Sequence, residues 1–295
     1  MKTGFASEKD IRSATTPRRL RGSKADNGRV LIIAGSDEYH GAPALAANAA
    51  YNTLAALRIG TGYAFLYVPG CILDPVRRLS PSLIVRPFGR KGIGQGSLGS
   101  IKEAVSKANA VVIGMGIGRD DRTLRMAAKI IGHAKSLDRK IVIDADAIYS
   151  LKYVKRLYPN AVITPQDKEF REASKEYPGS GPLEGRAAQA VALARRLGCC
   201  VLLKGHTTIV TDGVRVKLVS SKSSALATMG TGDVLSGIIG GYAAAGASAF
   251  RAAVAGAYLH ARIGDALHKA KGNHILSSDL AELIPSVLKK FDRDS

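Results

Sequence analysis

A glycine-rich segment that ends in an aspartate offers the strongest chemistry in the sequence. Residues 227–237 read Ala-Thr-Met-Gly-Thr-Gly-Asp-Val-Leu-Ser-Gly. Gly230 and Gly232 permit a tight turn with bare amides, and a helix starting at about Asp233 would aim its positive end at that turn. Such a turn suits a phosphate in transfer, and Asp233 could accept a proton from a substrate hydroxyl. The alternative is an ordinary turn in which Asp233 only caps the helix.

A second segment places a lysine at the end of an apolar run. Lys204 could neutralise a phosphate, Gly205 could admit it close to the backbone, and Thr207 and Thr208 could donate hydroxyl hydrogen bonds. His206 has no Cys, Asp or His at ligand spacing, so it is not expected to bind a metal. The alternative is a solvated lysine at a strand end. Such a side chain adds little to a core, so we expect its removal to affect ligand binding more than folding.

Two further segments place carboxylates after apolar runs. Asp144 and Asp146 follow one run and could order a hydrated Mg²⁺, or could cap the next helix. Thr164-Pro165 ends another run, and Glu169 falls in the first turn of the following helix, where an acidic residue also favours the helix dipole.

Two glycine-rich loops complete the set. Residues 113–118 read Ile-Gly-Met-Gly-Ile-Gly, without the context of a dinucleotide-binding fingerprint, because no acidic residue lies at the expected offset. Residues 34–44 form a glycine-bounded loop, which closes onto a helix opened by Ala42-Pro43. Each segment alone has a purely structural interpretation, but their recurrence at strand ends throughout one chain indicates a functional site.

Short apolar runs alternate with helical patterns and must position these segments. The runs predict strands buried on both faces, at 29–34, 63–68, 110–113, 141–143, 161–163 and 201–203. Helical periodicity is found at 42–58, 98–107, 122–135, 148–157 and 185–197. The alternation predicts an α/β protein with a parallel sheet covered by helices on both sides. In such a sheet ligands bind beyond the carboxyl ends of the strands, where the polar segments fall.

The two ends of the chain depart from this alternation. Residues 1–28 are polar and predict an extension with one short helix near 7–14, and residues 29–290 predict a single domain. Residues 207–210 and 214–219 predict an antiparallel hairpin at one edge of the sheet, joined at Asp212-Gly213. After Gly232 the chain is expected to be helical, through Leu267 and then over 278–290.

Composition excludes several classes of protein. The chain has 295 residues and a net charge of +19, with 46% hydrophobic and 23% charged residues, which is typical of a globular protein. The most apolar stretch, 234–250, is interrupted by glycines and too short to span a bilayer. The cysteines number three, without a Cys-x-x-Cys, which indicates reduced thiols and a cytoplasmic protein. Positive charge favours anionic partners, but few aromatics and no recognisable motif make nucleic acid an unlikely ligand.

Together these segments resemble the ADP/ATP-dependent NAD(P)H-hydrate dehydratases of the ribokinase-like superfamily. The resemblance runs from about Lys24 to Pro285. It rests on segments in the family's order: Ile33–Ser36, Gly41–Ala46, Asp144–Ala147, Thr164-Pro165, Glu169-Phe170, Lys204-Gly205, Thr208, Gly230–Leu235, Tyr258–His260, Ser277–Leu280 and Ile284-Pro285. It implies a three-layer α/β/α sandwich with a mostly parallel central sheet.

The resemblance also implies a function and the residues that carry it. The reaction would remove water from hydrated NADH or NADPH (NADHX, NADPHX), driven by ADP rather than ATP. Asp233 would be the catalytic base. The nucleotide would contact Lys204, Gly205, His206, Thr207, Thr208, Gly230, Thr231 and Gly232. The hydrated dinucleotide would contact Ala44, Gly116, Gln166 and Asp233, and Glu169 with Asp144 would order Mg²⁺ through water. A homotetramer and a separate NAD(P)H-hydrate epimerase as functional partner are also implied.

Three departures from the family pattern bear on this assignment. Gln166 stands where the family usually has a histidine that contacts the dinucleotide, so a Gln amide must supply that contact or it is absent. Residues 223–227 read Ser-Ser-Ala-Leu-Ala in place of the family's usual Gly-Asn-Pro-Gly-Met stretch. The segment ahead of the first expected strand is too short for the epimerase domain that many relatives carry.

Two rival functions stay open at this stage. A vitamin-precursor or sugar kinase would share the fold and the catalytic aspartate, and Gln166 slightly favours it because related kinases place Asn there. A nucleic-acid or dinucleotide-binding protein without turnover is the other rival, which a steep salt dependence of DNA binding would favour.

Overall fold

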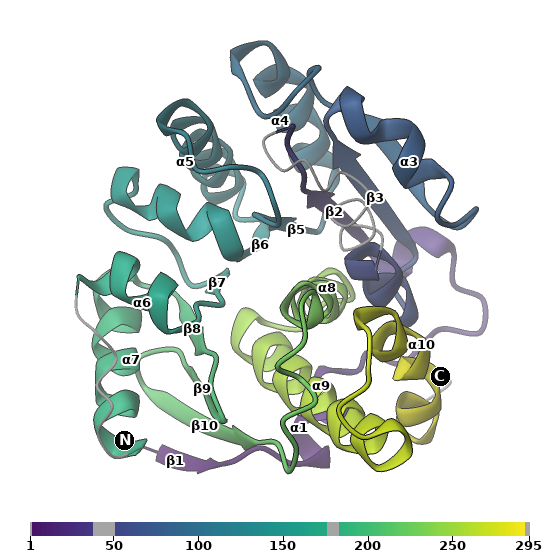
Figure 1. The fold of residues 1–295 in the computed structure, drawn as a ribbon, viewed down its shortest axis with the longest axis vertical. Helices are drawn as coiled ribbons and strands as arrows, with labels where there is room; N and C mark the ends of the chain where they lie inside the picture. Colours follow the sequence, from purple (N-terminus) through teal and green to yellow (C-terminus); the bar gives the residue numbers. More distant parts are fainter. Residues whose placement is uncertain (1, 38–50, 176–182, 293–295) are drawn as a thin grey trace.

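A computed structural model of the chain describes residues 2–37, 51–175 and 183–292. In these residues ten strands form one sheet at the centre of the molecule. The sheet order is β1-β10-β9-β8-β7-β6-β5-β2-β3-β4 (Figure 1). The strands are β1 (Lys2–Phe5), β2 (Arg29–Ile33), β3 (Tyr63–Val68), β4 (Ile84–Pro87), β5 (Ala110–Ile113), β6 (Lys140–Ile143), β7 (Ala161–Ile163), β8 (Cys200–Leu203), β9 (Thr207–Thr211) and β10 (Arg215–Ser220). Among the strands of the described ranges, β9 alone runs against its neighbours.

Side chains of the central strands are buried on both faces of the sheet. In β2, Val30 and Ile32 pack into one apolar core, whereas Leu31 and Ile33 pack into the other. Successive side chains of a strand point to opposite faces, so a strand covered on both sides reads as a continuous apolar run. The same pattern makes β5 fully buried.

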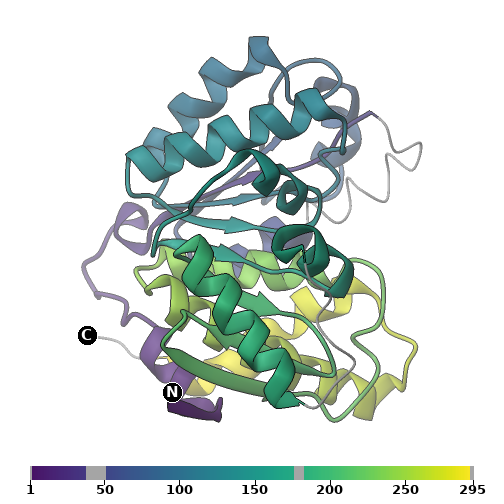
Figure 2. The same ribbon diagram turned by 90° about the vertical axis from the view of Figure 1, so that its left-hand side faces the viewer.

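Helices cover both faces and complete a three-layer α/β/α sandwich (Figure 2). One face carries α4 (Leu98–Lys107), α5 (Asp121–Ser136), α6 (Asp167–Ser174), α7 (Leu183–Leu197) and the 3₁₀ helix η4 (Ala145–Tyr153). The other carries α1 (Glu8–Ala14), α3 (Leu73–Arg77), α8 (Thr231–Ala244), α9 (Ala249–Lys271), α10 (Ser277–Leu288) and a helix over 51–58. Short 3₁₀ turns occupy Lys24–Asn27, Gly70–Ile72, Gln95–Ser97 and Lys289–Phe291. The expected fold class is confirmed.

Two edge strands were not predicted by the sequence. β1 lies within the segment expected to be an extension, and it pairs in parallel with β10, from Lys2 opposite Arg215 to Phe5 opposite Leu218. The predicted hairpin of β9 and β10 therefore lies one strand in from the edge. β4 pairs with β3 at the opposite edge, and only Val85 of its residues is buried. Because neither strand is covered on both faces, neither contains a continuous apolar run.

The predicted helix over 148–157 was also inaccurate in position and type. This stretch belongs to η4, which begins at Ala145 and ends at Tyr153. Ala145 itself has a positive φ of 47°, which bends the chain sharply after β6. The other expected helices agree with the structure to within a few residues, as far as the described ranges extend.

α8 lies close to its neighbours because glycines face them. A Cβ added at Gly237 would overlap the backbone carbonyl of Asn52, and one at Gly240 would overlap the side chain of Val112 in β5. This close approach places the start of α8 at the edge of the sheet where the parallel strands end, which we call the carboxyl edge.

The far end of α8 is closed by groups from distant parts of the chain. The Nζ of Lys140 donates to the carbonyl of Ala243 at 3.0 Å, and the hydroxyl of Thr16 donates to that of Ala245 at 2.7 Å. The Ala243 carbonyl also accepts the N–H of Gly246 at 3.2 Å, so Lys140 adds a second donor there, and its cation suits the negative end of the helix dipole.

Two buried cysteines sit side by side at β8. Cys199 belongs to one apolar core and Cys200 to the other, and burial raises the pKa of both thiols. Cys71 is exposed. In the described part of the chain, no helix combines the length and the apolar character needed to cross a bilayer.

Candidate active site

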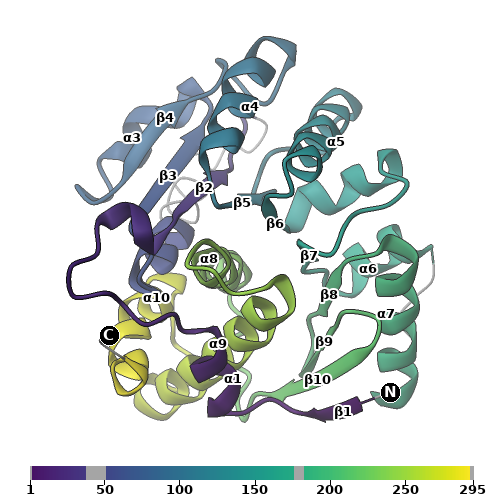
Figure 3. The same cartoon turned by 180° about the vertical axis from the view of Figure 1, so that it is seen from behind.

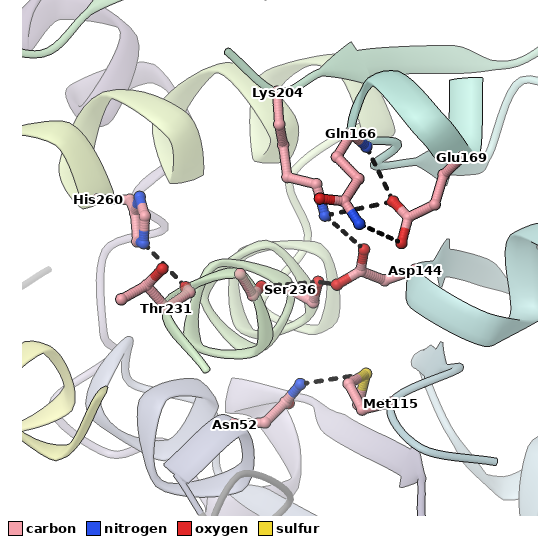
Figure 4. Close-up of polar contacts among 10 residues, drawn as sticks. Asn52, Met115, Asp144, Gln166, Glu169, Lys204, Thr231, Ser236 and His260 are labelled. Carbon is pink, nitrogen blue, oxygen red and sulfur yellow. Dashed lines mark hydrogen bonds and ion pairs between the residues drawn. The ribbon is translucent and has the colours of Figure 1, made fainter. Parts of the chain in front are cut away.

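Three neighbouring parallel strands end side by side and bring predicted polar segments together. Asp144 follows β6 directly, Lys204 follows β8 directly, and Gln166 follows β7 after Thr164-Pro165. Figure 4 shows their side chains converging near the first turns of α8. The topology therefore places residues separated by 60 positions in the sequence within hydrogen-bonding distance.

Lys204 is held between two buried carboxylates. Its Nζ lies 3.0 Å from Oδ1 of Asp144 and 3.7 Å from Oε2 of Glu169, whose side chains are 1% and 4% exposed. The other oxygen of Asp144 accepts a hydrogen bond from the Ser236 hydroxyl of α8 at 2.5 Å. Asp144 thus joins β8 to α8, and the ammonium group has a fixed position.

Glu169 is positioned by a reciprocal cap at the start of α6. The backbone N–H of Gln166 donates to Oε2 of Glu169 at 2.8 Å, and the Gln166 side-chain amide lies 3.5 Å from Oε1. This arrangement satisfies free amides of the first turn. It also leaves Gln166 exposed at the carboxyl edge, while Glu169 turns inward toward Lys204.

The first turn of α8 forms the expected anion-binding turn, with a shifted start. Gly230 is the N-cap, with a φ of 85° that only glycine adopts readily, and the helix begins at Thr231 rather than at about Asp233. The Thr231 hydroxyl donates to the carbonyls of Leu226 and Thr228 at 2.8 and 2.9 Å, which fixes the turn. Asp233 is therefore not a capping residue. It lies in the first turn, and its carboxylate makes no hydrogen bond or ion pair with the described residues.

Burial and neighbouring carboxylates make Asp233 a weak acid. Burial, then the negative charge of Asp144, raises the pKa of Asp233 to about 7, against the opposing effect of Lys204. Burial also raises the pKa of Glu169. Burial opposes the charge of Lys204, but Asp144 and Glu169 outweigh it, so the pKa of Lys204 is raised and the ammonium persists. A carboxylate that titrates near neutral pH can accept a proton and release it again.

A pocket of about 650 Å³ opens between β8, α8 and α9. Its wall includes seven residues assigned a binding role from the sequence, namely Gln166, Lys204, Gly205, His206, Thr208, Thr231 and Gly232. A Cβ added at Gly232 would lie 3.7 Å from Nζ of Lys204, so the ammonium is adjacent to the start of α8. The pocket thus offers a cation and free helix amides at the same end.

Other residues assigned from the sequence lie elsewhere. The Thr207 hydroxyl is 3.2 Å from that of Ser220, within the β9–β10 pair, and it does not line this pocket. Gly230 and Asp233 are likewise not part of its wall. Gly116 lies in the turn after β5 with a φ of 62°, and Ala44 falls outside the described residues.

Three residues of the site were not predicted from the sequence: two line the pocket and one holds Asp144. His260 of α9 lines the pocket and donates from Nε2 to the carbonyl of Thr231 at 2.9 Å, and burial lowers its pKa to about 4, so it is neutral. Met229 lines the pocket with 76% of its surface exposed, and Ser236 anchors Asp144. In the sequence, His260 stood out only as part of a C-terminal motif of the family. For Met229, the one indication was its position directly before Gly230 of the glycine turn.

The carboxylates do not form a site for a directly coordinated metal. Both oxygens of Asp144 are engaged, one by Lys204 and one by Ser236, and Oε2 of Glu169 accepts the Gln166 amide. Within the described ranges, no cluster of three or more His, Cys, Asp or Glu side chains is arranged to hold an ion. A hydrated Mg²⁺ that keeps its waters and binds mainly through substrate phosphates fits this arrangement.

Asp146 has a structural partner instead. It is buried, it accepts the Nε–H of Arg119 at 2.6 Å, and it accepts the backbone N–H of Gly118 at 3.2 Å. The second carboxylate after β6 therefore stabilises the glycine-rich turn after β5.

Comparisons with known proteins give consistent results over nearly the whole chain. A family model described as NAD(P)H-hydrate dehydratase matches residues 30–286. The ADP-dependent (S)-NAD(P)H-hydrate dehydratase of Cenarchaeum symbiosum is 35% identical over 288 residues, covering 97% of each chain. The protein of the same description from Nitrosopumilus maritimus is 31% identical, with 94% of this chain and 93% of that one covered.

A bifunctional NAD(P)H-hydrate repair enzyme of Methanothermobacter thermautotrophicus is 35% identical over 92% of this chain, which spans 52% of that longer protein. Among solved structures, a ribokinase-like superfamily protein of Enterococcus faecalis superposes with a TM-score of 0.84 at 23% identity, covering 99% of this chain and 97% of that one. The ADP/ATP-dependent NAD(P)H-hydrate dehydratase of Bacillus subtilis, co-crystallised with ATP and Mg²⁺, has a TM-score of 0.78 at 24% identity, covering 99% and 100%. These two structural likenesses concern the fold.

Proposed function

The chain belongs to the NAD(P)H-hydrate dehydratase family, and from this premise we propose that it is an ADP-dependent (S)-NAD(P)H-hydrate dehydratase. Its substrates are NADHX and NADPHX, hydrated forms of NADH and NADPH that carry a hydroxyl next to the nitrogen of the reduced nicotinamide ring. Its products are NADH or NADPH, AMP and phosphate. Curated relatives of the same length carry this description, which supports ADP over ATP.

The observation that carries this proposal is the fixed ammonium of Lys204 beside the amides that begin α8. Both face a pocket of about 650 Å³, large enough for a nucleotide. A cation and a helix N-terminus stabilise the negative charge of a phosphoryl group in transfer. Lys204, Gly205, His206, Thr207 and Thr208 would hold the nucleotide together with Gly230, Thr231 and Gly232. For Thr207, whose hydroxyl pairs with Ser220 and which does not line the pocket, this role rests on the sequence alone.

The proposed reaction has two steps, transfer of a phosphoryl group to the substrate and elimination of phosphate. The substrate hydroxyl oxygen attacks the terminal phosphorus of ADP, the bond from that phosphorus to AMP breaks, and the hydroxyl proton passes to Asp233. The original bond between the ring carbon and the now phosphorylated oxygen then breaks and releases phosphate, assisted by the lone pair of the ring nitrogen, and loss of a proton from the adjacent carbon restores the reduced ring. Phosphorylation is required because hydroxide alone is a poor leaving group.

Asp233 suits the role of base because its carboxylate has no other partner among the described residues. Its pKa of about 7 keeps much of it ionised at neutral pH while leaving it basic enough to accept the proton. Gln166, Gly116 and Ala44 would contact the hydrated dinucleotide, with the exposed Gln166 amide replacing the histidine that relatives usually carry there.

Mg²⁺, where it participates, neutralises charge on the nucleotide phosphates. Glu169 and Asp144 would contact it only through its water shell, because their own oxygens are engaged within the protein. Their direct role is to hold Lys204 in place.

The wider setting of the reaction is also part of the proposal. A homotetramer is the expected assembly, and an NAD(P)H-hydrate epimerase on a separate chain would supply the (S) form, as bifunctional relatives combine two activities in one longer protein. Free cysteines suit a reducing compartment, so the cytoplasm is the expected location. Residues 29–290 are the proposed catalytic domain.

Hydrated NADH incubated with the protein and ADP, and separately with ATP, tests this function directly. Recovery of the reduced-nicotinamide absorbance together with stoichiometric AMP is the expected result. Nucleotide consumption with stable phosphorylation of another small molecule would instead indicate a kinase. No recovery with either nucleotide would contradict the dehydratase assignment.

A further inference from the structure

A second cavity, of about 660 Å³, lies at the end of α8 remote from the pocket just described. Its wall combines residues 14–19, 22, 26 and 27, the end of the helix over 51–58 with the two residues after it, Tyr242 and Ala245 at the far end of α8, and the C-terminal residues 285, 288, 289, 291 and 292. It shares no lining residue with the nucleotide pocket. Figure 3 shows the N-terminal segment passing around α10 and the C-terminus on this side of the molecule.

The segment of residues 15–27, which we call the N-terminal strap, is anchored at its two ends. At one end the Thr16 hydroxyl binds the carbonyl of Ala245, and Arg18 donates to the carbonyl of Gly60 at 2.8 Å. At the other end the carbonyl of Asn27 accepts the backbone N–H of Gly62 at 3.2 Å. The residues between these anchors are exposed, so the strap encloses space rather than filling it.

Positive charge predominates in the cavity wall. Arg18, Arg19, Arg58 and Lys289 line it, against the carboxylates of Asp26 and Asp292. Asp26 is already engaged, because one of its oxygens accepts both the backbone N–H and the hydroxyl of Ser23.

Two of these four cations have a structural function, and two do not. Arg18 anchors the strap. Arg58 donates to the carbonyl of Ala281, which Pro285 leaves without a helical partner, and to that of Glu282. In the described part of the chain, the side chains of Arg19 and Lys289 form no hydrogen bond or ion pair. The charge of Arg19 helps to lower the pKa of the Asp26 carboxyl, but that carboxylate is held by Ser23, so both cations can still meet an anion.

The floor of the cavity is apolar. It includes Leu57, Ile59, Pro285, Leu288 and the buried ring of Phe291. An apolar floor beneath a cationic rim is the usual composition of a site for an organic anion, whose body contacts the floor while its charge meets the cations.

We propose that this cavity binds a small organic phosphate: a phosphate monoester with an apolar body, no larger than a mononucleotide. Arg19 and Lys289 bind the phosphate, and the apolar body packs on Leu57 and Phe291. The site is separate from the nucleotide pocket, and α8 contributes to both, with Thr231 and Gly232 at one and Tyr242 at the other. The proposal holds whether or not the dehydratase assignment is correct.

A ¹⁹F NMR titration with 4-fluorophenyl phosphate tests the site on the full chain. The double variant Arg19→Gln/Lys289→Gln is compared with the control Arg21→Gln/Lys24→Gln. The control removes the same charge from two exposed positions of the strap that do not line the cavity. We expect saturable binding to the unaltered protein and to the control, and at least tenfold weaker binding to the lining variant.

Melting temperatures measured on the same samples establish that each variant is folded, and Lys289→Gln alone replaces the double variant if that fails to fold. Three results would overturn the proposal. They are the absence of saturable binding to the unaltered protein, equal weakening in both double variants, and undiminished binding in the folded lining variant. The last result would mean that the probe occupies the nucleotide pocket.

Discussion

At the level of single residues, Asp233 combines two properties that normally conflict. A half-buried carboxylate without a partner destabilises the folded state once it is charged, yet a base must carry that charge. The negative charges of Asp144, Glu169 and Asp146 increase this cost, and Lys204 offsets part of it. We interpret Asp233 as a residue retained for its chemistry at some expense in stability.

The variant Asp233→Asn should separate the two properties. Because Asn cannot accept a proton, we expect turnover to fall by about a hundredfold to ten-thousandfold. The pKa of Asp233 lies above that of an unfolded aspartate, so its ionisation costs stability progressively between about pH 4 and pH 7 and fully above. The melting temperature of the variant should therefore equal or exceed that of the parent at pH 8, with the difference shrinking toward pH 4. Near-normal turnover in the folded variant would contradict the assignment of Asp233 as base.

Lys204 shows where the sequence was misleading at this scale. Loss of a lysine at a strand end was expected to affect folding less than ligand binding, but here the side chain neutralises two buried carboxylates. Its contacts come from Asp144 and Glu169, on two other strand–helix connections. No local pattern around Lys204 could reveal them.

Lys204→Ala should consequently impair both nucleotide binding and folding. Removing one partner leaves buried charge uncompensated, which typically costs about 3–5 kcal/mol. Denaturant unfolding measures that loss, and the double variant Lys204→Ala/Asp144→Asn should regain part of it because one unpaired charge is gone. If ADP affinity by calorimetry were unchanged in folded Lys204→Ala, the assignment of the nucleotide pocket would be wrong.

At the level of elements, α8 depends on glycines where it meets its neighbours. Gly237 faces the backbone carbonyl of Asn52, whereas Gly132 in α5 has no atom within 4 Å of an added Cβ. The two positions are both helical and differ in the space around them.

Alanine substitution at these two glycines should have opposite effects. Gly132→Ala should stabilise the protein by about 0.5–1 kcal/mol, because alanine loses less conformational entropy in a helix. Gly237→Ala should destabilise it by about 1–3 kcal/mol through overpacking, and should reduce turnover because the start of α8 shifts. Thermal unfolding and turnover of both variants provide the comparison, and a stabilising effect of Gly237→Ala would refute the close packing of α8.

The extent of successful prediction also differs between elements for physical reasons. β3, β5 and β7 were predicted with their observed bounds because each contributes apolar residues to the core of a covered sheet. The start of α8 was misplaced by two residues, since it depends on the positive φ of Gly230, and this conformation is not encoded in helical periodicity. The bond from Ser236 to Asp144 joins residues 92 positions apart and follows only from how α8 packs on the sheet.

At the level of the whole molecule, β1 is the edge strand of the sheet on one side and covers the longer strand β10. It leaves β10 with partners on both sides, and the following helix α1 packs against α9. An unpaired strand at this edge would offer free backbone groups for association with other chains.

Deletion of residues 1–6 should therefore lower the melting temperature and promote aggregation, because β10 becomes an exposed edge. Turnover per folded molecule should persist, since Lys204 and Asp233 are not contacted by this segment. Light scattering and turnover measured before and after centrifugation distinguish the two effects. Unchanged melting temperature and solubility would show that β1 contributes nothing to stability.

The adjacent cysteines Cys199 and Cys200 at the start of β8 can report how fast each helical layer opens away from the sheet. Their thiols face opposite layers, so neither can react with a labelling reagent until the packing on its own side opens. In native buffer, dithiobis(nitrobenzoate) should react rapidly with Cys71 alone, and all three thiols should react rapidly in guanidinium. The slower phases in native buffer then time the opening of each layer, and a single shared rate for Cys199 and Cys200 would mean that the two layers separate from the sheet in one event.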